Sequence, residues 1–412
     1  MVGVAAARPA GTRDCGAMDD VLRHLDDLPG GARLRAAAAA TDVPAYLVGG
    51  AVRDLLLGRV PRELDVAVEG DPAPLIDALG GEAARHERFG TAVVRGEGWC
   101  VDVARTRAER YPQPGALPEV EPADIDRDLL RRDATINAIA VPLAGGEPVA
   151  ADHALADLRA GVLRVLHDAS FLDDPTRLWR LARYRARLGF ELEPTTAELA
   201  RDAVAGGALA TVSGVRIGNE LRLAAAEADP VAAARSAHEL GLAPWLDPDE
   251  ERLTAARALT PEEARGDLVT LAALLAAGTG TAVLDELGFT ASERVVLLEA
   301  LAVRRGRRHP AGPRPSQIAA AFRGLPVEAV ALAPAADADA AARWLGELRH
   351  VGLSIDGADL LGAGVPQGPE VGVRLRTTLD EVLDGVVGPD RAAQLAAATR
   401  GTADTEPPGD GD

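Results

Sequence analysis

Helical spacing of apolar residues runs through most of this chain, and strand-like patterns are confined to the residues before about position 154. Beyond that point apolar side chains recur every three to four residues, whereas short alternating or wholly apolar runs precede it. Aromatic residues make up only 3% of the 412 residues, so aliphatic contacts between helices must supply most of the core. A chain of this length is expected to form about two to four domains. The pattern predicts an α+β fold.

The N-terminal region predicts a mixed sheet with helices. Strands are predicted over 45–48, 64–68, 91–94 and 99–103. A helix is predicted over 73–79, a helical pattern covers 19–40, and the proline-rich, acidic segment 110–128 is predicted to be a loop. Together these elements predict a mixed α/β domain of roughly a hundred residues, which is the commonest domain size.

Capping signals predict where helices begin in the C-terminal part. Asp174 followed by Pro175 predicts a helix start, and Gly189 predicts its end. Three capping boxes each predict the start of another helix: Thr195/Glu198, Thr260/Glu263 and Thr290/Glu293. The residues beyond 154 are therefore expected to form a succession of helices.

Charge and composition exclude several classes of function. All 44 basic residues are arginine, which rules out a phosphate-loop lysine and a Schiff-base lysine. With a net charge of −19, a polyanionic partner must meet a local basic patch. No uninterrupted apolar stretch is long enough for a membrane span. Residues 1–16 lack the pattern of a secretory signal and are expected to be a frayed extension, with Met18 as an alternative start. Cys15 and Cys100 cannot form a disulfide framework, which fits a reducing cytosol.

Three carboxylates are candidates for a metal site. Glu63 and Asp65 stand at i and i+2 on a predicted strand, so they project from the same face, about 6 to 7 Å apart at the backbone. Asp102, on a later strand, is a candidate third member. Magnesium prefers oxygen ligands with substrate phosphates completing its shell, the arrangement used for displacement at phosphorus. The alternative is an exposed acidic strand face.

A glycine turn precedes these carboxylates. Gly49 and Gly50 lie at a predicted strand-to-helix turn, where backbone amides can approach phosphate oxygens. Arg53 adds a guanidinium fork for the same phosphates. Tight packing of the turn with a solvated Arg53 is the alternative.

A row of arginines marks the helix predicted after Asp174. Arg177, Arg180, Arg183 and Arg187 share one side of a helical wheel, and Arg185 falls off the pattern. Guanidinium forks suit phosphates and base edges. Asp174 can cap the helix, offer an acceptor to a base, or do both, and the arginines can equally form a solvated face.

Taken together, these motifs resemble those of bacterial CCA-adding and A-adding tRNA nucleotidyltransferases of the polymerase-β superfamily. The segment LVGGAVRDLLLGR at 47–59 with ELD at 63–65 resembles their head motif, and RRDATINA at 131–138 resembles their second motif. The segment DDPTR at 173–177 is similar to their neck motif, and a weaker echo of the tail lies at 357–385. Three ordered motifs at compatible spacing are a specific signal.

The resemblance implies a fold and a domain plan. It implies an α+β chain with a polymerase-β-like nucleotidyltransferase head, a mixed sheet with helices, followed by an all-α neck, body and tail. The expected segments are a disordered extension at 1–18, the head at 19–145, the base-recognition neck at 146–222, a helical body at 223–300, a tRNA-binding tail at 301–400 and a disordered end at 401–412.

The resemblance also implies an activity, template-independent addition of CMP and AMP, or AMP alone, to the tRNA 3′ end. Glu63 and Asp65 would hold two Mg²⁺ ions, with Asp102 as a further catalytic carboxylate. The implied nucleotide-binding residues are Gly49, Gly50, Arg53, Arg132, Asp133, Asn137, Asp174, Arg177, Arg180 and Arg183. Arg132 and Asp133 can alternatively form a structural ion pair.

The implied partners are ATP, CTP and the acceptor arm of tRNA. The enzyme is expected in the cytoplasm, without a membrane partner, and the sequence leaves its oligomeric state open. Three departures stand out: Glu63 stands where the family usually has aspartate, Ala134 replaces the usual phenylalanine, and Val215 replaces a usual glutamate. A poly(A) polymerase is the rival with the same chemistry, although residues 86–92 look like the tRNA enzymes. A catalytically silent RNA-binding homologue is the rival from another class.

Overall fold

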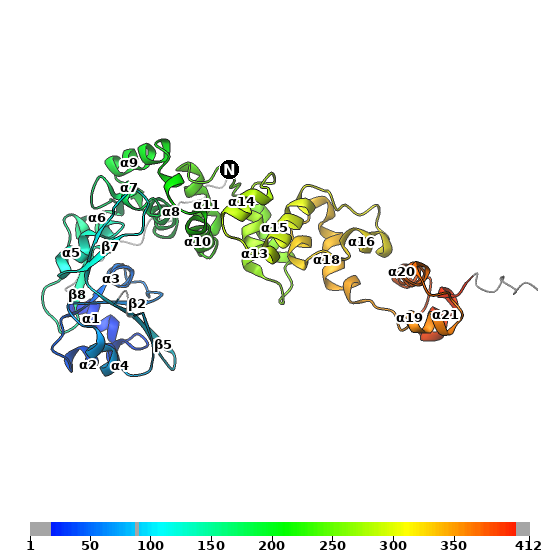
Figure 1. The fold of residues 1–412 in the computed structure, drawn as a ribbon, viewed down its shortest axis with the longest axis horizontal. Coiled ribbons are helices and arrows are strands. Elements are labelled where there is room, and N and C mark those ends of the chain that lie inside the picture. The colour runs from blue at the N-terminus through cyan, green and yellow to red at the C-terminus, as the bar shows by residue number, and fades with distance from the viewer. Residues whose placement is uncertain (1–17, 87–89, 401–412) are drawn as a thin grey trace, which may run out of the picture. The chain divides into compact units, whose positions relative to one another are not determined.

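The computed structural model describes residues 18–86 and 90–400 (Figure 1). The predicted disordered segments fall outside the described residues, except that Met18 begins helix α1 (Met18–Asp26). Cys15 also lies outside the described residues. So do residues 87–89, which belong to the stretch 86–92 that distinguishes the tRNA enzymes from the poly(A) polymerases. The chain divides into two compact units, Met1–Ala243 and Pro244–Asp412. The α+β class is confirmed.

A mixed seven-stranded sheet forms the head within the described residues (Figure 1). In spatial order its strands are β3 (Glu82–His86), β4 (Thr91–Gly96), β5 (Trp99–Arg105), β2 (Leu64–Val68), β1 (Ala45–Val48), β8 (Ile139–Pro142) and β9 (Val149–Ala150). Strands β2 and β5 pair in parallel, and the other pairings in this sheet are antiparallel. All four predicted strands are therefore present, with small shifts at their ends.

Helices cover the sheet on both faces. Helices α1, α2 (Gly31–Ala39), α3 (Gly50–Leu56) and α4 (Ala73–Leu79) contact one another and the strands. Helix α5 (Ile125–Leu130) packs with Ala67 and Ala140 in a separate buried cluster. Because side chains alternate along β2, Asp65 shares its face with Ala67 and thus with α5. The cover on that face is incomplete, which leaves Asp65 only partly buried.

Two predictions for the head need correction. The segment 19–40 forms two helices because the chain turns at Gly30, whose φ of 83° favours glycine. The predicted loop 110–128 contains β7 (Glu119–Pro122), which pairs with β6 (Arg107–Arg110), and the start of α5. Strand β7 is exposed throughout, so it shows none of the apolar alternation from which strands are predicted.

The rest of the first unit, from α6 onward, is helical apart from one short parallel strand pair, β10 (Val162–Leu163) with β11 (Glu191–Leu192). Its helices are α6 (Ala154–Ala160), α7 (Ser170–Asp173), α8 (Thr176–Leu188), α9 (Pro194–Ala205), α10 (Gly214–Ala225) and α11 (Pro230–Glu239). Helix α8 packs on α10 and α11 and buries Leu178, Trp179 and Leu181. Two of the α8 arginines, Arg177 and Arg183, are buried as well.

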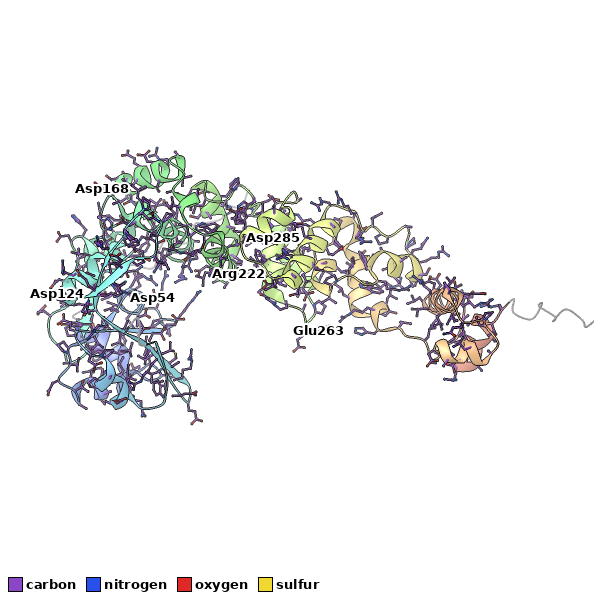
Figure 2. All side chains as sticks on the ribbon, viewed as in Figure 1. Asp54, Asp124, Asp168, Arg222, Glu263 and Asp285 are labelled. Carbon is purple, nitrogen blue, oxygen red and sulfur yellow. The ribbon has the colours of Figure 1, made fainter. Side chains whose placement is uncertain are left out.

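The second unit consists of helices around apolar clusters. The helices are α12 (Glu250–Leu259), α13 (Gly266–Leu274), α14 (Thr281–Glu286), α15 (Ala291–Arg304), α16 (Pro315–Phe322), α17 (Val327–Val330), α18 (Ala338–Gly346), α19 (Gly357–Gly362), α20 (Pro369–Leu383) and α21 (Arg391–Ala398). One cluster gathers Ile318, Phe322 and Trp344. Charged side chains such as Glu263 and Asp285 project from this unit and pair with arginines (Figure 2).

One of the three predicted capping boxes is confirmed. Thr290 and Glu293 cap α15 reciprocally. Helix α9 instead begins at Pro194, because the Glu193 side chain accepts the hydrogen bond from Thr196 N at 2.8 Å. Thr260 ends α12 rather than starting a helix, and α13 begins only at Gly266. The predictions at Thr195 and Thr260 are thus wrong. Glu193 caps α9 in place of Thr195, and Thr260 lies at the C-terminal end of α12.

Over the described residues, the longest apolar helices fall short of what crossing a membrane requires.

Candidate active site

A cleft of about 510 Å³ opens where the sheet of the head meets helix α8 of the neck. All the nucleotide-binding candidates predicted from the sequence line it, together with Glu63 and Asp65, and Asp102 is the one predicted site residue outside its lining. The tertiary fold thus collects residues from positions 49 to 223 into one place. Their individual roles remain predictions.

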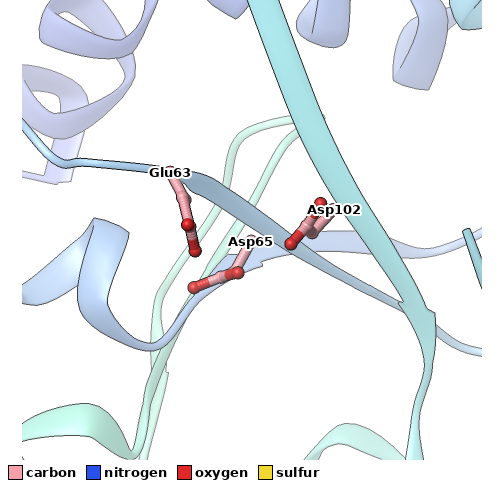
Figure 3. Close-up of side chains that lie close together, drawn as sticks. All are labelled: Glu63, Asp65 and Asp102. Carbon is pink, nitrogen blue, oxygen red and sulfur yellow. The ribbon is translucent and has the colours of Figure 1, made fainter. Parts of the chain in front are cut away.

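Glu63, Asp65 and Asp102 form a carboxylate triad, of which Glu63 and Asp65 line the cleft and Asp102 lies beside it. Asp65 and Asp102 are directly paired across the parallel strands β2 and β5, and Glu63 lies two residues before Asp65 on the same face. One oxygen from each carboxylate lies within 4.8 Å of the others. Figure 3 shows the three side chains pointing toward one another. Parallel register is the physical cause of the convergence.

The charge of this triad is incompletely balanced by the protein. Burial, followed by the neighbouring charges of Asp102 and Glu63, raises the pKa of Asp65 to about 6, although Arg132 and Arg180 oppose the rise. Burial and Glu63 also raise the pKa of Asp102. Crowded oxygens with a surplus of negative charge match the ligand preference of a divalent cation. Glu63 is exposed while Asp65 and Asp102 are partly buried, so an exposed acidic strand face describes only part of this arrangement.

Gly49 permits a close approach at the strand-to-helix turn. Its φ is 67°, and a Cβ there would lie 2.9 Å from a guanidinium nitrogen of Arg132 and 3.6 Å from Oδ2 of Asp65. A side chain at position 49 would therefore push Arg132 away from the triad. The glycine places a cation beside the carboxylates.

Arg53 is buried, so its predicted alternative as a solvated side chain is wrong. Its Nε donates to Asp54 and its Nη1 donates to the Asn137 side-chain oxygen, each at 2.8 Å. The guanidinium also lies 5.5 Å from the centre of the Tyr184 ring. Arg53 reaches the cleft wall with a fixed orientation, because three different neighbours hold it.

Asp133 is the centre of a buried polar network. It accepts hydrogen bonds from Asn137 Nδ2 at 2.8 Å and from the Tyr184 hydroxyl at 2.6 Å, and it pairs with Arg180 Nε at 2.6 Å. Burial alone favours the protonated acid, but Arg180 and the two hydrogen bonds hold the pKa of Asp133 well below its usual range. Both carboxylate oxygens are engaged within the protein, which favours an orienting role.

Arg132 pairs with Asp128, at 2.9 Å, rather than with its sequence neighbour Asp133. The alternative of an Arg132–Asp133 ion pair is therefore wrong, because successive side chains diverge at the end of α5. Among the described residues, Arg132 Nε is buried and has no hydrogen-bond partner. The residue as a whole lines the cleft, so other parts of its guanidinium can face a ligand.

Asp174 and Arg177 meet different partners at the start of α8. Asp174 Oδ1 accepts from Thr176 N at 3.0 Å and from Arg216 Nη2 at 2.8 Å, so its capping role is confirmed. Arg177 is 3% exposed and donates to Ser170 Oγ and to the Arg131 carbonyl, both at 2.7 Å. Both residues line the cleft in fixed orientations.

The arginines of α8 face the cleft as their spacing predicts, but they are not a solvated basic stripe. Arg180 pairs with Asp133, Arg183 with Glu220 and Arg187 with Glu227. Arg185 points elsewhere and pairs with Glu239. Carboxylates of the protein therefore pair with the α8 arginines, which a helical wheel alone would show as unpaired.

Several lining residues escaped sequence analysis. Tyr184 lies four residues after Arg180 and was detectable from helical spacing, whereas Tyr111, Arg62 and Arg107 come from loops and short strands without a periodic signal. Tyr111 lies 5.9 Å, measured to its ring centre, from the Arg177 guanidinium. Only the tertiary structure brings these side chains to the cleft.

Comparisons with known proteins agree with this geometry. Residues 45–164 match the family model of the poly A polymerase head domain. An A-adding tRNA nucleotidyltransferase of Geobacter sulfurreducens is 44% identical over 216 residues, covering 50% of this chain and 24% of that protein. A CC-adding tRNA nucleotidyltransferase of Deinococcus radiodurans is 42% identical over 207 residues, covering 48% and 54%.

Similarity in structure extends further along the chain. A CCA-adding enzyme in an apo form superposes with a TM-score of 0.75 and 25% identity, over 91% of this chain and 94% of that one. The sequence matches, in contrast, span about half of the second curated relative and a quarter of the first. The head model, the two relatives and the shared architecture together show that this chain is similar to bacterial tRNA nucleotidyltransferases.

Proposed function

We propose that this protein adds CMP and AMP, or the terminal AMP alone, to the 3′ end of tRNA by metal-dependent nucleotidyl transfer in the cytoplasm. The observation that carries the proposal is the cleft that combines the Glu63 and Asp65 carboxylates, with Asp102 next to them, with a wall of arginines. Relatives named for A addition and for CC addition support the reaction class. CCA-adding enzymes of similar fold have been solved with ATP and with CTP, which supports these substrates.

Glu63 and Asp65 are proposed to hold Mg²⁺, with Asp102 completing the acidic surface. When bound, magnesium would neutralise the triphosphate and activate the 3′-hydroxyl of the primer. The guanidinium of Arg132, which lies beside Gly49, would bind a phosphate oxygen together with the backbone of Gly49 and Gly50. Arg53 and Asn137, fixed by Asp54 and Asp133, would shape the wall against which the nucleotide lies.

Base choice is proposed to rest on Asp174 and Arg177 at the start of α8. Asp174 offers a carboxylate acceptor and Arg177 offers donors, which together match the edge of a base. The existing contacts of both groups hold them in position before a nucleotide binds. Arg180 and Arg183 continue the same wall.

The second unit is proposed to grip the tRNA by shape and phosphate contacts, as duplex RNA requires. Its arginine cluster at the end of α15 is partly committed already, because Arg304 donates to Asp247 at 2.5 Å and Arg305 donates to the Ala277 carbonyl. Arg307 is exposed, and Arg308 lies 3.8 Å from Glu299. These two are the members of the cluster best suited to meet phosphate.

The test is incorporation on defined primers. The protein is incubated with tRNAs that end before the first C, after one C and after two, with Mg²⁺ and each nucleotide offered alone. Addition to these ends and not to an unrelated RNA supports the proposal, and the pattern distinguishes CCA, CC and A addition. Long adenylate tails on any RNA would favour a poly(A) polymerase, and no incorporation at all would favour a silent RNA-binding protein.

Asp174→Asn is expected to raise misincorporation while leaving stability nearly unchanged. An asparagine still accepts the cap hydrogen bond from Thr176 N, but it presents an altered pattern to a base, which costs about 1–3 kcal/mol of discrimination. Competition between ATP and CTP on one primer measures the fidelity, and thermal unfolding checks the fold. An unchanged ratio of the two products would assign Asp174 to capping alone.

Glu63→Asp is expected to retain activity, because it restores the shorter ligand usual in the family and keeps the charge. Glu63 is exposed, so the change disturbs little packing. Incorporation rates measured across a magnesium titration compare the two ligands. A dead variant would show that the metal geometry of this chain depends on the longer side chain.

A further inference from the structure

Glu227 lies behind the cleft and binds arginines from both the head and the neck. Its side chain is 2% exposed, and it is not among the described residues that line the cleft. It accepts from Arg187 Nε at 2.9 Å, pairs with Arg62 Nη2 at 3.2 Å and lies 3.9 Å from Arg183 Nη1. All three arginines line the cleft. One buried carboxylate therefore fixes three cations of the site.

The three arginines come from elements with different roles. Arg183 and Arg187 belong to α8, the helix that also carries the base-recognition candidates. Arg62 immediately precedes Glu63, the first carboxylate of the triad. A second link runs the same way, since Arg59 Nη1 donates to the Arg187 carbonyl at 3.4 Å. Through Glu227, helix α8, which is proposed to select the base, is thus connected with the segment that leads into β2.

We infer that Glu227 is a positioning residue that couples helix α8 to the metal-binding end of β2 through Arg62. This inference rests on the proposed nucleotidyl transfer. Displacements of about 1 Å in a reacting group can lower a rate about 100-fold, so a tether one residue from Glu63 has leverage on the chemical step. A purely structural ion pair would contribute to stability and leave the turnover of the folded enzyme unchanged.

Arg62→Gln is the variant that tests the coupling without burying an uncompensated charge. The Arg62 side chain is 57% exposed, whereas removing Glu227 would leave buried arginines unpaired and threaten folding. Arg185→Gln is the matched control, because it removes another α8 ion pair, with Glu239 at 2.7 Å, outside the cleft. Arg62→Lys keeps a cation for Glu227.

We expect Arg62→Gln to lower kcat by roughly 10- to 100-fold with little change in KM for the nucleotide. Arg62→Lys should restore most of the rate, and Arg185→Gln should behave as wild type. Wild-type kcat in Arg62→Gln would overturn the inference. A loss that Arg62→Lys fails to rescue would also overturn it, because the guanidinium would then be acting on substrate directly.

Hydrogen exchange gives a readout that does not depend on activity. Peptides that cover residues 59–66 should exchange faster in Arg62→Gln than in wild type, while Arg185→Gln leaves them unchanged. Unchanged exchange in Arg62→Gln would reject the tether even if the wild-type protein incorporated no nucleotide. Absence of incorporation by wild type, in contrast, would reject the proposed function, and the two failures are distinguishable.

Discussion

Asp65→Asn is expected to abolish nucleotide incorporation, with a loss of roughly 1,000-fold or more, because it removes the central ligand of the carboxylate triad. The same change should stabilise the metal-free protein. The pKa of Asp65 is raised to about 6, so ionising this carboxyl above that pH opposes folding, and an amide removes a cost of about 1–3 kcal/mol at pH 8. Incorporation assays and thermal unfolding without metal measure the two effects.

The stability difference has a defined pH dependence. Between the unfolded pKa of about 3.9 and the folded value of about 6, the folded wild type binds a proton that the unfolded chain does not. Wild type therefore gains stability as the pH falls through 6, and the advantage of Asp65→Asn should shrink there. Binding of tRNA should persist in the variant, since phosphate contacts of arginines dominate such affinity. Activity within a few-fold of wild type would remove Asp65 from the proposed metal site.

Asp133→Ala is expected to lower the free energy of unfolding by about 3–5 kcal/mol, because it leaves a cation and buried donors without their common acceptor. Urea unfolding at pH 7 measures the loss. Asp77→Ala is the matched control: Asp77 is 70% exposed and pairs with Arg85 on the surface, where an ion pair contributes about 1 kcal/mol or less.

Acid should reduce the effect of Asp133→Ala. The pKa of Asp133 is held below its usual range in the folded protein, so its contribution is fully present above the unfolded pKa of about 3.9 and is lost as the pH falls toward the folded value. The difference between wild type and Asp133→Ala should therefore narrow below pH 4. Equal losses in Asp133→Ala and Asp77→Ala at pH 7 would contradict the central role of the Asp133 network.

Local patterns determined much of the fold. Strands at 64–68 and 99–103 and the helix at 73–79 were predictable because apolar alternation, glycine and proline act within a few residues. The exposed strand β7 and the start of α9 were mispredicted because they depend on pairing and on a competing cap, which no local pattern records. The domain boundaries drawn from the resemblance stay predictions.

The candidate site shows the same division. Motif spacing identified Glu63, Asp65 and the arginines of α8, because a strand with period two and a helix with period 3.6 fix which side chains share a face. The partners of these groups were decided only in three dimensions. Arg132 pairs with Asp128 instead of Asp133, and the α8 arginines meet Glu220 and Glu227 from beyond α8.

The sequence by itself determined which functional groups the site contains, because the types and the spacing of its carboxylates, glycines and guanidinium groups are fixed along the chain. The tertiary structure decided which of those groups remain available to a ligand. That outcome depends on burial and on countercharges from distant segments, as the exposed Glu63 and the fully hydrogen-bonded Asp133 illustrate. Coulomb attraction and desolvation depend on distance in space, which separation along the chain does not fix.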